Sequence, residues 1–453
     1  MTSARNVVIV GANAAGAKAA SRIRRLDPAA RITILEQGRY ISYAGCGLPY
    51  CVSGKIAAID ELIKPPYGSV RDAESFRKTK NIDILTGRRV EEIDRKDKTV
   101  RAHNLDTGQQ ESYAYDKLVL AMGATPITPP VEGVDLKGLY HLTRMEDAEA
   151  LVSILADRPG GSAVIVGAGF IGMEAAEALA ERKWEVTVIE RYDQVFPWAL
   201  DFEMAAFVQE HCFEHMVEFE LGAEITRFEG DDKGQVVRVV TAKDTYDADL
   251  VILATGMRPN VGLARAAGLK IGETGALAVD EYLRTSDPDI FAGGDLVENV
   301  HRVTGKKCYI PLGSTANKHG RVIGDNVCGL QTRFPGVAGT FVCKVFDVAV
   351  GSTGLSENAA LKAGLEVESV CAPGFDKAHY YPGSEVLGLK VVSEKRSGRL
   401  LGVQAVGRGE VARRIDVAAT AASFGATVDQ LANLDLAYAP PYSQAMDCLI
   451  AAA

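Results

Sequence analysis

Two segments of the chain share one pattern of apolar and polar positions. Residues 7–36 and 163–190 each begin with a short Val/Ile run and pass through a glycine turn into an Ala-rich stretch with helical spacing. Each segment ends in a second apolar run that closes on Glu. The repeat therefore predicts two βαβ units.

A further apolar run follows each unit. The run that starts at Lys117 and the run that starts at Asp249 both lead into a glycine turn. Parallel strands joined by helical crossovers form a doubly wound sheet, whose ligands bind beyond the carboxyl ends of the strands. We therefore expect an α/β fold with two Rossmann-like domains and two nucleotide sites.

The pattern changes after about residue 331. Apolar runs at residues 339–350, 386–392 and 400–406 predict strands, and residues 410–424 have the spacing of a helix. This part of the sequence carries no nucleotide-binding glycine motif. We expect a third, α+β domain here, with dimerisation as its use.

Charge and cysteine usage exclude several classes of protein. The 453 residues carry a formal net charge of −9, so the chain lacks the overall basic character of nucleic-acid-binding proteins. The N-terminal residues lead directly into a predicted strand, so we expect no secretory signal there, and no apolar run reaches the ~18 residues of a membrane helix. The eight cysteines form no C-x-x-C pair or zinc-type Cys/His cluster. We expect a cytoplasmic protein with free thiols and without a metal, nucleic-acid or membrane partner.

The glycines of the second repeat match the whole dinucleotide fingerprint. Gly167, Gly169 and Gly172 would allow a tight turn, backbone approach to a pyrophosphate and close helix packing. Glu190, at the end of the next strand, is placed to accept hydrogen bonds from a ribose 2′-OH. This carboxylate favours NADH over NADPH because it would repel a 2′-phosphate, although Arg191 beside it keeps NADPH possible.

The first repeat departs from the fingerprint. Gly11, Gly16 and the terminal Glu36 are present, but Asn13 stands where the second glycine is usual. Residues 285–295 (TSDPDIFAGGD) resemble the second FAD motif of the pyridine nucleotide-disulfide oxidoreductases, in which the Asp contacts the ribityl chain. The resemblance covers nearly the whole chain and implies FAD as a cofactor beside NADH.

This resemblance also implies a domain organisation and a set of cofactor contacts. We expect an FAD-binding domain at 1–118 and 260–331, an NAD(P)H-binding domain at 119–259, and a dimerisation domain at 332–453 in a homodimer. The residues implied to hold FAD are Gly11, Gly16, Glu36, Gly123, Asp295, Leu312, Gly313 and Ser314. Those implied to hold the nicotinamide dinucleotide are Gly167, Gly169, Gly172, Glu190 and Gly256.

Residues 42–50 (SYAGCGLPY) resemble the single-cysteine motif of coenzyme A-disulfide reductases and their NADH oxidase and peroxidase relatives. Leu48 precedes a proline and is expected to avoid α geometry, while Pro49 suits the first turn of a helix. Cys46 would then lie just ahead of a helix N-terminus, which lowers the pKa of a thiol. The resemblance implies that Cys46 forms a mixed disulfide which reduced flavin cleaves, and that Ser42 contacts the substrate.

Cys51 leaves an alternative open. Cys46 and Cys51 have the spacing of the redox pair in glutathione and lipoamide reductases, although the residues around them do not match that motif. Residues five apart on a regular helix face different ways and lie too far apart for a disulfide. The break at Pro49 weakens this objection, so Cys51 is either a redox partner or a packing residue.

Two features bear on the choice among the relatives. The oxidase and peroxidase relatives carry a His in the first glycine turn, where this chain has Ala14. The coenzyme A-disulfide reductases carry the tyrosine segments found here at 380–383 and 437–442. By this resemblance, Tyr380 and Tyr438 of a partner subunit would donate a hydrogen bond or proton to the thiolate that leaves Cys46. An NADH oxidase or peroxidase with a Cys46 sulfenate is the alternative.

Basic residues on the first predicted helix suggest the substrate. Lys18, Arg22 and Arg25 fall at the family's coenzyme A contact positions, and a solvated helix face is the alternative interpretation. Ser75 and Met446 occupy two further positions that are basic elsewhere in the family. The substrate is therefore expected to be coenzyme A disulfide or a smaller persulfide or polysulfide.

Overall fold

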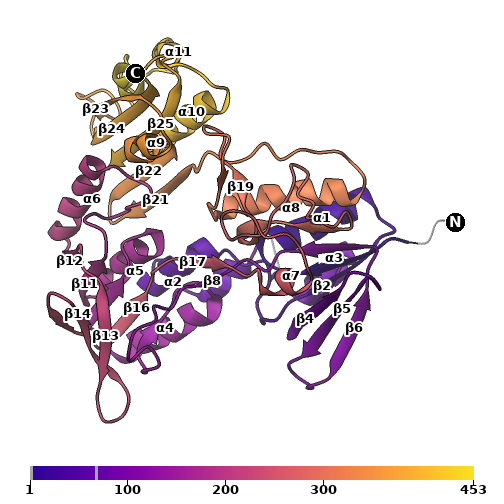
Figure 1. Ribbon diagram of the computed structural model, residues 1–453. Coiled ribbons are helices and arrows are strands. Elements are labelled where there is room, and N and C mark those ends of the chain that lie inside the picture. Colours follow the sequence, from indigo (N-terminus) through magenta and orange to yellow (C-terminus); the bar gives the residue numbers. More distant parts are fainter. Residues whose placement is uncertain (1–3, 67–69) are drawn as a thin grey trace.

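The first repeat folds into a βαβ unit in the computed structural model, which describes residues 4–66 and 70–453 (Figure 1). The first three residues, at the start of the segment for which we expect no secretory signal, lie outside the described part. Five parallel strands form one sheet in the order β18-β7-β1-β2-β3. The elements are β1 (Asn6–Val10), α1 (Ala14–Leu26), β2 (Arg31–Leu35), β3 (Asp83–Leu85), β7 (Lys117–Leu120) and β18 (Ile290–Ala292).

The second repeat builds the same unit in a second parallel sheet, whose order is β12-β11-β10-β16-β9. Its elements are β9 (Leu139–Tyr140), β10 (Ser162–Val166), α5 (Phe170–Glu181), β11 (Glu185–Glu190), β12 (Val217–Leu221) and β16 (Leu250–Leu253). The same backbone hydrogen bond from the first glycine of the turn is found in both units. Gly11 N donates to Leu35 O over 2.9 Å, and Gly167 N donates to Ile189 O over 2.8 Å.

A three-stranded antiparallel sheet accompanies each parallel sheet. One consists of β4 (Arg88–Asp94), β5 (Thr99–Asn104) and β6 (Gln110–Ala114), and the other of β13 (Ile225–Gly230), β14 (Val236–Thr241) and β15 (Thr245–Asp247). A short pair joins β19 (Asn299–Val300) to β20 (Lys307–Cys308). Further helices are α2 (Leu48–Ser53), α3 (Ala73–Lys80), α4 (Met145–Asp157), α6 (Phe202–Glu214), α7 (Gly262–Ala266), α9 (Glu357–Lys362), α11 (Val428–Ala432), α12 (Cys448–Ala452), and the 3-10 turns η1 (Gly45–Gly47), η2 (Ile59–Ile63) and η3 (Gly294–Leu296).

The chain crosses between the two parallel sheets twice, and the two crossings are paired. β8 (Ala124–Pro126) runs antiparallel to β17 (Met257–Pro259), and Figure 1 shows the pair between the first and second sheets. The second sheet is thus inserted between β7 and β18 of the first, as the resemblance implied. The domain limits at residues 118 and 259 stay a prediction.

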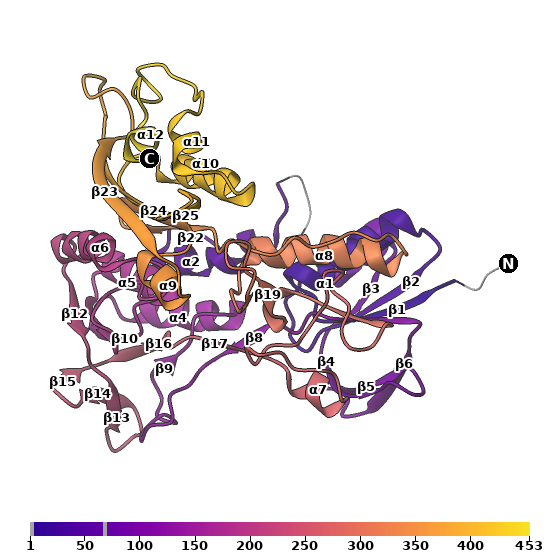
Figure 2. The ribbon, with the colours of Figure 1, turned by 45° about the horizontal axis from the view of Figure 1, so that its top comes forward.

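Helix α8 (Gly313–Val327) lies alongside α1 over the first sheet (Figure 2). Two glycines make this approach possible. A Cβ atom at Gly320 would lie 2.5 Å from Ala15 O, and one at Gly324 would lie 2.6 Å from Arg22 Cβ. The close packing carries the start of α8 to the glycine turn of the first repeat.

The C-terminal part is an antiparallel sheet in the order β21-β22-β25-β24-β23. Its elements are β21 (Phe341–Val345), β22 (Val348–Gly354), β23 (Val367–Phe375), β24 (Val386–Glu394), β25 (Leu400–Gly407) and the covering helix α10 (Val411–Ser423). The expectation of one strand at 339–350 is wrong, because the run forms a hairpin that turns at Phe346 and Asp347. Apolar residues flank the turn on both sides, so the pattern contains little polar punctuation.

The sequence pattern also missed β23. This edge strand is partly exposed along its whole length and contains Pro373 and Gly374. Pro and Gly are depleted in strands, and an exposed edge lacks a continuous apolar run. The strand exists because its backbone pairs with β24 over nine residues.

Helix α2 follows β2 in the chain but packs against the inserted part. Leu48 and Val52 are buried in a cluster that includes Met173 of α5 and Val345 of β21. Helix α2 is therefore held in place by elements of the inserted part and of the C-terminal sheet. In the part of the chain that the structure describes, no helix is long and apolar enough to cross a membrane.

Candidate active site

The glycine turn of the first repeat requires its two glycines. Gly11 has φ +102°, and a Cβ atom there would lie 2.3 Å from Ala121 O. A Cβ atom at Gly16 would lie 1.9 Å from Gly11 O. Glu36 closes the turn, because its Oε2 accepts from Ala12 N over 2.8 Å. Glu36 therefore lies at the carboxyl end of β2, as its position in the sequence predicted.

The turn of the second repeat has the same geometry. Gly167 has φ +108°, and a Cβ atom at Gly172 would lie 1.9 Å from Gly167 O. The buried Glu190 accepts at Oε2 from Ala168 N over 2.8 Å and at Oε1 from Tyr192 N over 3.0 Å. Gly169 differs, since a Cβ atom there would meet nothing within 4 Å. The fold therefore does not require a glycine at position 169, and the open space there leaves room for a ligand.

The environment of the first turn fits a dinucleotide. Asn13 precedes α1, and its buried Oδ1 has no hydrogen-bond partner among the described residues. A buried acceptor without a donor is costly, and a ligand hydroxyl or amide would satisfy it. Gly123, with φ +63°, likewise has open space where a Cβ atom would stand, and Gly256, with φ +113°, takes the equivalent place in the second half.

The second FAD-type motif lies against the first turn. A Cβ atom at Gly294 would lie 3.3 Å from Ala15 Cβ, which places Asp295 near the start of α1. Burial raises the pKa of Asp295. His319, which was not predicted from the sequence, holds this motif in place because its Nδ1 accepts from Gly294 N over 3.1 Å. Complete burial lowers the pKa of His319 to about 4, so the ring is neutral and can accept this bond.

Cys46 lies in the turn η1, immediately before α2. A Cβ atom at Gly313 would lie 4.0 Å from Cys46 Sγ, so the structure brings the cysteine to the segment Leu312, Gly313 and Ser314 at the start of α8. A Cβ atom at Gly47 would lie 2.3 Å from Leu62 Cδ2, so a larger residue after the cysteine would require the Leu62 side chain to move. Cys46 itself is exposed.

The expectation that Leu48 avoids α geometry is wrong. Leu48 has φ −58° and ψ −46°, and α2 begins at this residue with Pro49 in its first turn. The α region is disfavoured before a proline but not forbidden. Burial of the Leu48 side chain in the cluster around α5 favours the observed conformation.

The expectation of a lowered Cys46 pKa is also not met by this chain. Although the residue as a whole is exposed, protein atoms packed around the sulfur remove water from it and raise the pKa of the thiol, and the carboxylates of Glu174 and Asp295 raise it further. Burial and the neighbouring Glu177 raise the pKa of Glu174 to about 7. The helix that follows has only six residues, so its dipole does not outweigh these effects. Glu174 was not predicted from the sequence, although an acid in the Ala-rich part of α5 was a visible signal.

Cys51 lies in a different environment from Cys46. Its side chain is buried in the cluster that α2 shares with α4 and α5, whereas Cys46 is exposed beside α8. Both residues are free thiols in this structure. These surroundings favour packing over redox chemistry for Cys51.

The basic residues near α1 divide into two groups. Lys18 and Arg25 are exposed and lie close to Lys80, whose pKa is lowered by burial and then by the positive charges of Arg71, Arg25 and Lys18. Arg71 also donates from Nη1 to Ser42 O over 3.3 Å, which links this cluster to the cysteine segment. Arg71 and Lys80 were not predicted from the sequence, because α3 and the residues before it carry no recognisable motif.

Arg22 is not part of this basic cluster. Its Nε donates to Asp325 Oδ1 of α8 over 2.5 Å, and the Asp325 side chain is buried. This ion pair joins α1 to α8. The guanidinium of Arg22 is therefore less available to a substrate than Lys18 or Arg25.

Tyr380 and Tyr438 come together at the surface of the C-terminal sheet. A hydrogen bond to Tyr438 is the first cause that raises the pKa of Tyr380. The two side chains remain 66% and 50% exposed, and Tyr442 and Met446 nearby in the chain are also exposed. Large apolar groups left uncovered together are typical of an interaction surface.

Known proteins share this whole architecture. A model of the pyridine nucleotide-disulphide oxidoreductases matches residues 5–320, and one of their dimerisation domain matches residues 340–449. The NAD(P)H sulfur oxidoreductase (CoA-dependent) of Pyrococcus abyssi is 40% identical over 98% of this chain and 97% of its own. An NADH oxidase of Methanocaldococcus jannaschii is 35% identical over 98% and 97%. The structure of a NAD-dependent persulfide reductase from A. fulgidus has a TM-score of 0.96 and 50% identity, covering 98% of this chain and 82% of that one.

These matches confirm the predicted fold class. The first family model spans both parallel sheets, and the second spans the C-terminal antiparallel sheet. Sequence identity of 40% over nearly the full length of both chains accompanies the shared architecture. The chain therefore belongs to the pyridine nucleotide-disulphide oxidoreductase family.

Proposed function

We propose that this chain is an FAD-dependent NAD(P)H oxidoreductase that reduces coenzyme A persulfide, polysulfide or coenzyme A disulfide through a mixed disulfide at Cys46. The observation that carries the proposal is the position of Cys46 Sγ, 4.0 Å from a Cβ atom placed on Gly313. The segment around Gly313 resembles the one that faces the flavin in this family. A thiol at that place can exchange electrons with the cofactor.

The two glycine turns would bind the two dinucleotides. Gly11, Gly16 and Glu36 would hold the adenosine half of FAD, and Asp295 its ribityl chain. When bound, FAD supplies the transfer of two electrons from NAD(P)H to sulfur. Glu190 would accept a hydrogen bond from the adenosine ribose, which favours NADH because a 2′-phosphate would meet a carboxylate.

Cys46 would act as the nucleophile on sulfur. Its thiolate attacks the substrate S–S bond, a bond forms between Cys46 Sγ and one sulfur, and the other sulfur leaves as a thiolate that takes a proton. Two electrons from NADH then cleave the mixed disulfide, and the second sulfur also leaves protonated. For a coenzyme A persulfide, NADH and one proton yield NAD+, coenzyme A and hydrogen sulfide.

The basic cluster of Lys18, Arg25, Arg71 and Lys80 supports an anionic thiol carrier. Arg71 of this cluster donates a hydrogen bond to Ser42 O, so the positive charge lies near the segment that carries Cys46. Phosphate groups of coenzyme A are anions of suitable chemistry for such a cluster. The NAD(P)H sulfur oxidoreductase of Pyrococcus abyssi is described as CoA-dependent, which agrees with this assignment.

We assign Tyr380 and Tyr438 to the cysteine of the partner subunit in a homodimer. Their exposed hydroxyls would donate a hydrogen bond or proton to the leaving thiolate. To test this, Cys46→Ser subunits are mixed with Tyr380→Phe/Tyr438→Phe subunits after each homodimer is found to be impaired. Mixed dimers with one intact composite site should recover part of the activity. No recovery after demonstrated subunit exchange would place the tyrosines outside the site.

NADH oxidase activity is the second candidate, because an NADH oxidase of Methanocaldococcus jannaschii is 35% identical over nearly the whole chain. Ala14, in place of the His of the oxidase and peroxidase relatives, removes an expected proton donor from the first turn. We therefore expect oxygen reduction to be slower than sulfur reduction.

The deciding assay follows NADH oxidation with coenzyme A persulfide, polysulfide, coenzyme A disulfide, peroxide and oxygen, the sulfur substrates being used without oxygen. Cys46→Ser should keep FAD and NADH binding but lose sulfur reduction. Cys371→Ser changes another exposed cysteine and serves as the matched control. Sulfur reduction that survives in Cys46→Ser would overturn the proposal. So would a wild-type enzyme that reduces oxygen but none of the sulfur substrates.

A further inference from the structure

We propose that His211, His215 and Asp347 form a binding site for one divalent transition-metal ion, with zinc as the expected occupant. The three ligand atoms lie within 4.8 Å of one another. The residues come from the end of α6 and from the turn between β21 and β22. They are distinct from Cys46, from the glycine turns and from every residue used in the proposed reaction.

The distances are close to those of a zinc site. His211 Nε2 lies 2.6 Å from Asp347 Oδ1, and His215 Nε2 lies 3.9 Å from the same oxygen. Zinc bonds to N and O ligands of 2.0–2.1 Å imply ligand atoms roughly 3.3 Å apart in a tetrahedral site. Side-chain adjustments of less than about 1 Å would bring these pairs to that spacing.

His211 is the strongest evidence for a bound cation. The residue is only 5% exposed. Asp347 Oδ1 lies 2.6 Å from its Nε2, but at an angle that does not suit a hydrogen bond, so Nε2 makes none among the described residues. Its other nitrogen, Nδ1, lies 3.3 Å from Glu214 Oε2. A proton on Nδ1 shared with Glu214 leaves a lone pair on Nε2. Metal-binding histidines are typically oriented by such a carboxylate on the opposite nitrogen.

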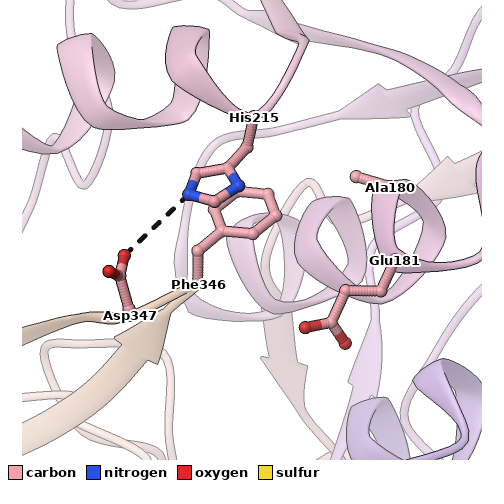
Figure 3. Close-up of a pocket in the computed structure, with 5 residues that line it drawn as sticks. All are labelled: Ala180, Glu181, His215, Phe346 and Asp347. Atoms are coloured by element: carbon pink, nitrogen blue, oxygen red, sulfur yellow. Dashed lines mark ion pairs between the residues drawn. The ribbon is translucent and has the colours of Figure 1, made fainter.

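His215 is oriented by packing against an aromatic ring. Its ring stacks on Phe346, with centroids 4.0 Å apart and an interplanar angle of 5°. Figure 3 shows the ring over Phe346 with one nitrogen directed toward Asp347. Phe346 has φ +55°, in the left-handed region that a bulky residue rarely adopts. The strained turn thus places both the stacking partner and the carboxylate beside α6.

The two carboxylate oxygens of Asp347 have different neighbours. Arg408 Nε binds Oδ2 over 2.9 Å, so that Oδ1 faces the two histidines. Arg408 also lies 3.5 Å from Glu214 Oε2, which offsets its positive charge. A cavity of about 410 Å³ adjoins His215 and Asp347, with Glu181 on its other side (Figure 3). The cavity has room for a water molecule as the fourth ligand.

The ion would connect two parts of the fold. His211 and His215 belong to the inserted part of the chain, and Asp347 belongs to the C-terminal sheet. A metal bound to both restrains their relative position and stabilises the folded state in proportion to its occupancy. Because Asp347 lies far from the two histidines in sequence, the spacing of cysteines and histidines along the chain could not predict this site.

The test uses the tag-free FAD-loaded enzyme with Cys46→Ser, which removes the competing reactive thiol. After treatment with a chelator, Zn²⁺ is titrated by calorimetry, and the bound metal is located by anomalous diffraction at the zinc edge. We expect one Zn²⁺ per chain, a density peak between His215 and Asp347, and a higher melting temperature with Zn²⁺.

His215→Gln and Asp347→Asn should each weaken the zinc Kd at least about tenfold. Glu181→Gln lines the same cavity and should leave the Kd within about threefold, and unchanged FAD content would establish that all variants fold. An absence of binding tighter than about 1 mM, equal affinity in the ligand variants, or a zinc peak elsewhere would overturn the proposal.

Discussion

Two glycines of the second turn should respond to alanine in opposite ways. At Gly172, the new Cβ would lie 1.9 Å from Gly167 O, a backbone atom that cannot rotate away. At Gly169, the same atom would meet nothing within 4 Å, and the backbone, with φ −82°, is open to any residue. One glycine therefore serves the fold, and the other would serve the ligand.

The expected magnitudes separate the two roles. Gly172→Ala forces β10 and α5 apart and should lower the free energy of unfolding by about 1–3 kcal/mol. Gly169→Ala replaces a favourable N-cap residue, but it also lowers the conformational entropy of the unfolded chain. The two effects oppose each other, so the free energy of unfolding should change by less than about 1 kcal/mol. If the pyrophosphate of NADH approaches the backbone at position 169, the methyl group of the new alanine should weaken NADH binding at least tenfold, which corresponds to about 1.4 kcal/mol.

The assay pairs urea unfolding with the NADH dependence of flavin reduction, both measured on FAD-loaded protein. Wild-type NADH affinity in Gly169→Ala would mean that the dinucleotide does not contact this turn. Wild-type stability in Gly172→Ala would mean that the close contact with Gly167 O does not constrain the fold.

Three further predictions concern other parts of the site. The raised pKa of Glu174, about 7, means that its contribution to stability is fully present at low pH and is lost as pH rises through that value. Glu174→Gln should therefore raise the melting temperature relative to wild type more at pH 8 than at pH 5, and an equal difference at both would contradict this. Replacing Lys18 and Arg25 with Gln should raise the KM for coenzyme A substrates at least tenfold at low salt but leave inorganic polysulfide unchanged; a parallel loss for both would remove the coenzyme A assignment. Gly324→Ala should destabilise the α1–α8 contact by about 1–3 kcal/mol in urea unfolding, whereas Gly262→Ala, in open space, should not.

The sequence was informative where one residue type is required by the backbone itself. Gly11, Gly16 and Gly167 could be predicted because their turns exclude a Cβ atom, and Glu36 and Glu190 because they end the adjacent strands. Such constraints are local, so they appear as spacing in the chain.

Features that depend on contacts between distant elements could not be predicted in the same way. The raised pKa of Cys46 arises from burial and from Glu174 and Asp295, which follow it by more than a hundred residues. The left-handed Phe346 splits an apolar run that looked like one strand, because neighbouring strands and Glu177 fix the turn. Arg22 was expected at the substrate, and its ion pair depends on the close approach of α8.

The pairing of β8 with β17 makes the inserted segment a module with adjacent ends. Pro126 and Met257 are direct neighbours across the pair, so a short turn could join them and omit everything between at a small loop-closure cost. The remaining chain would nevertheless lose the surface that covers Leu48 and Val52 of α2. Transplanting this module between relatives would therefore succeed only together with a matching α2, and the reactive cysteine would be inherited with it.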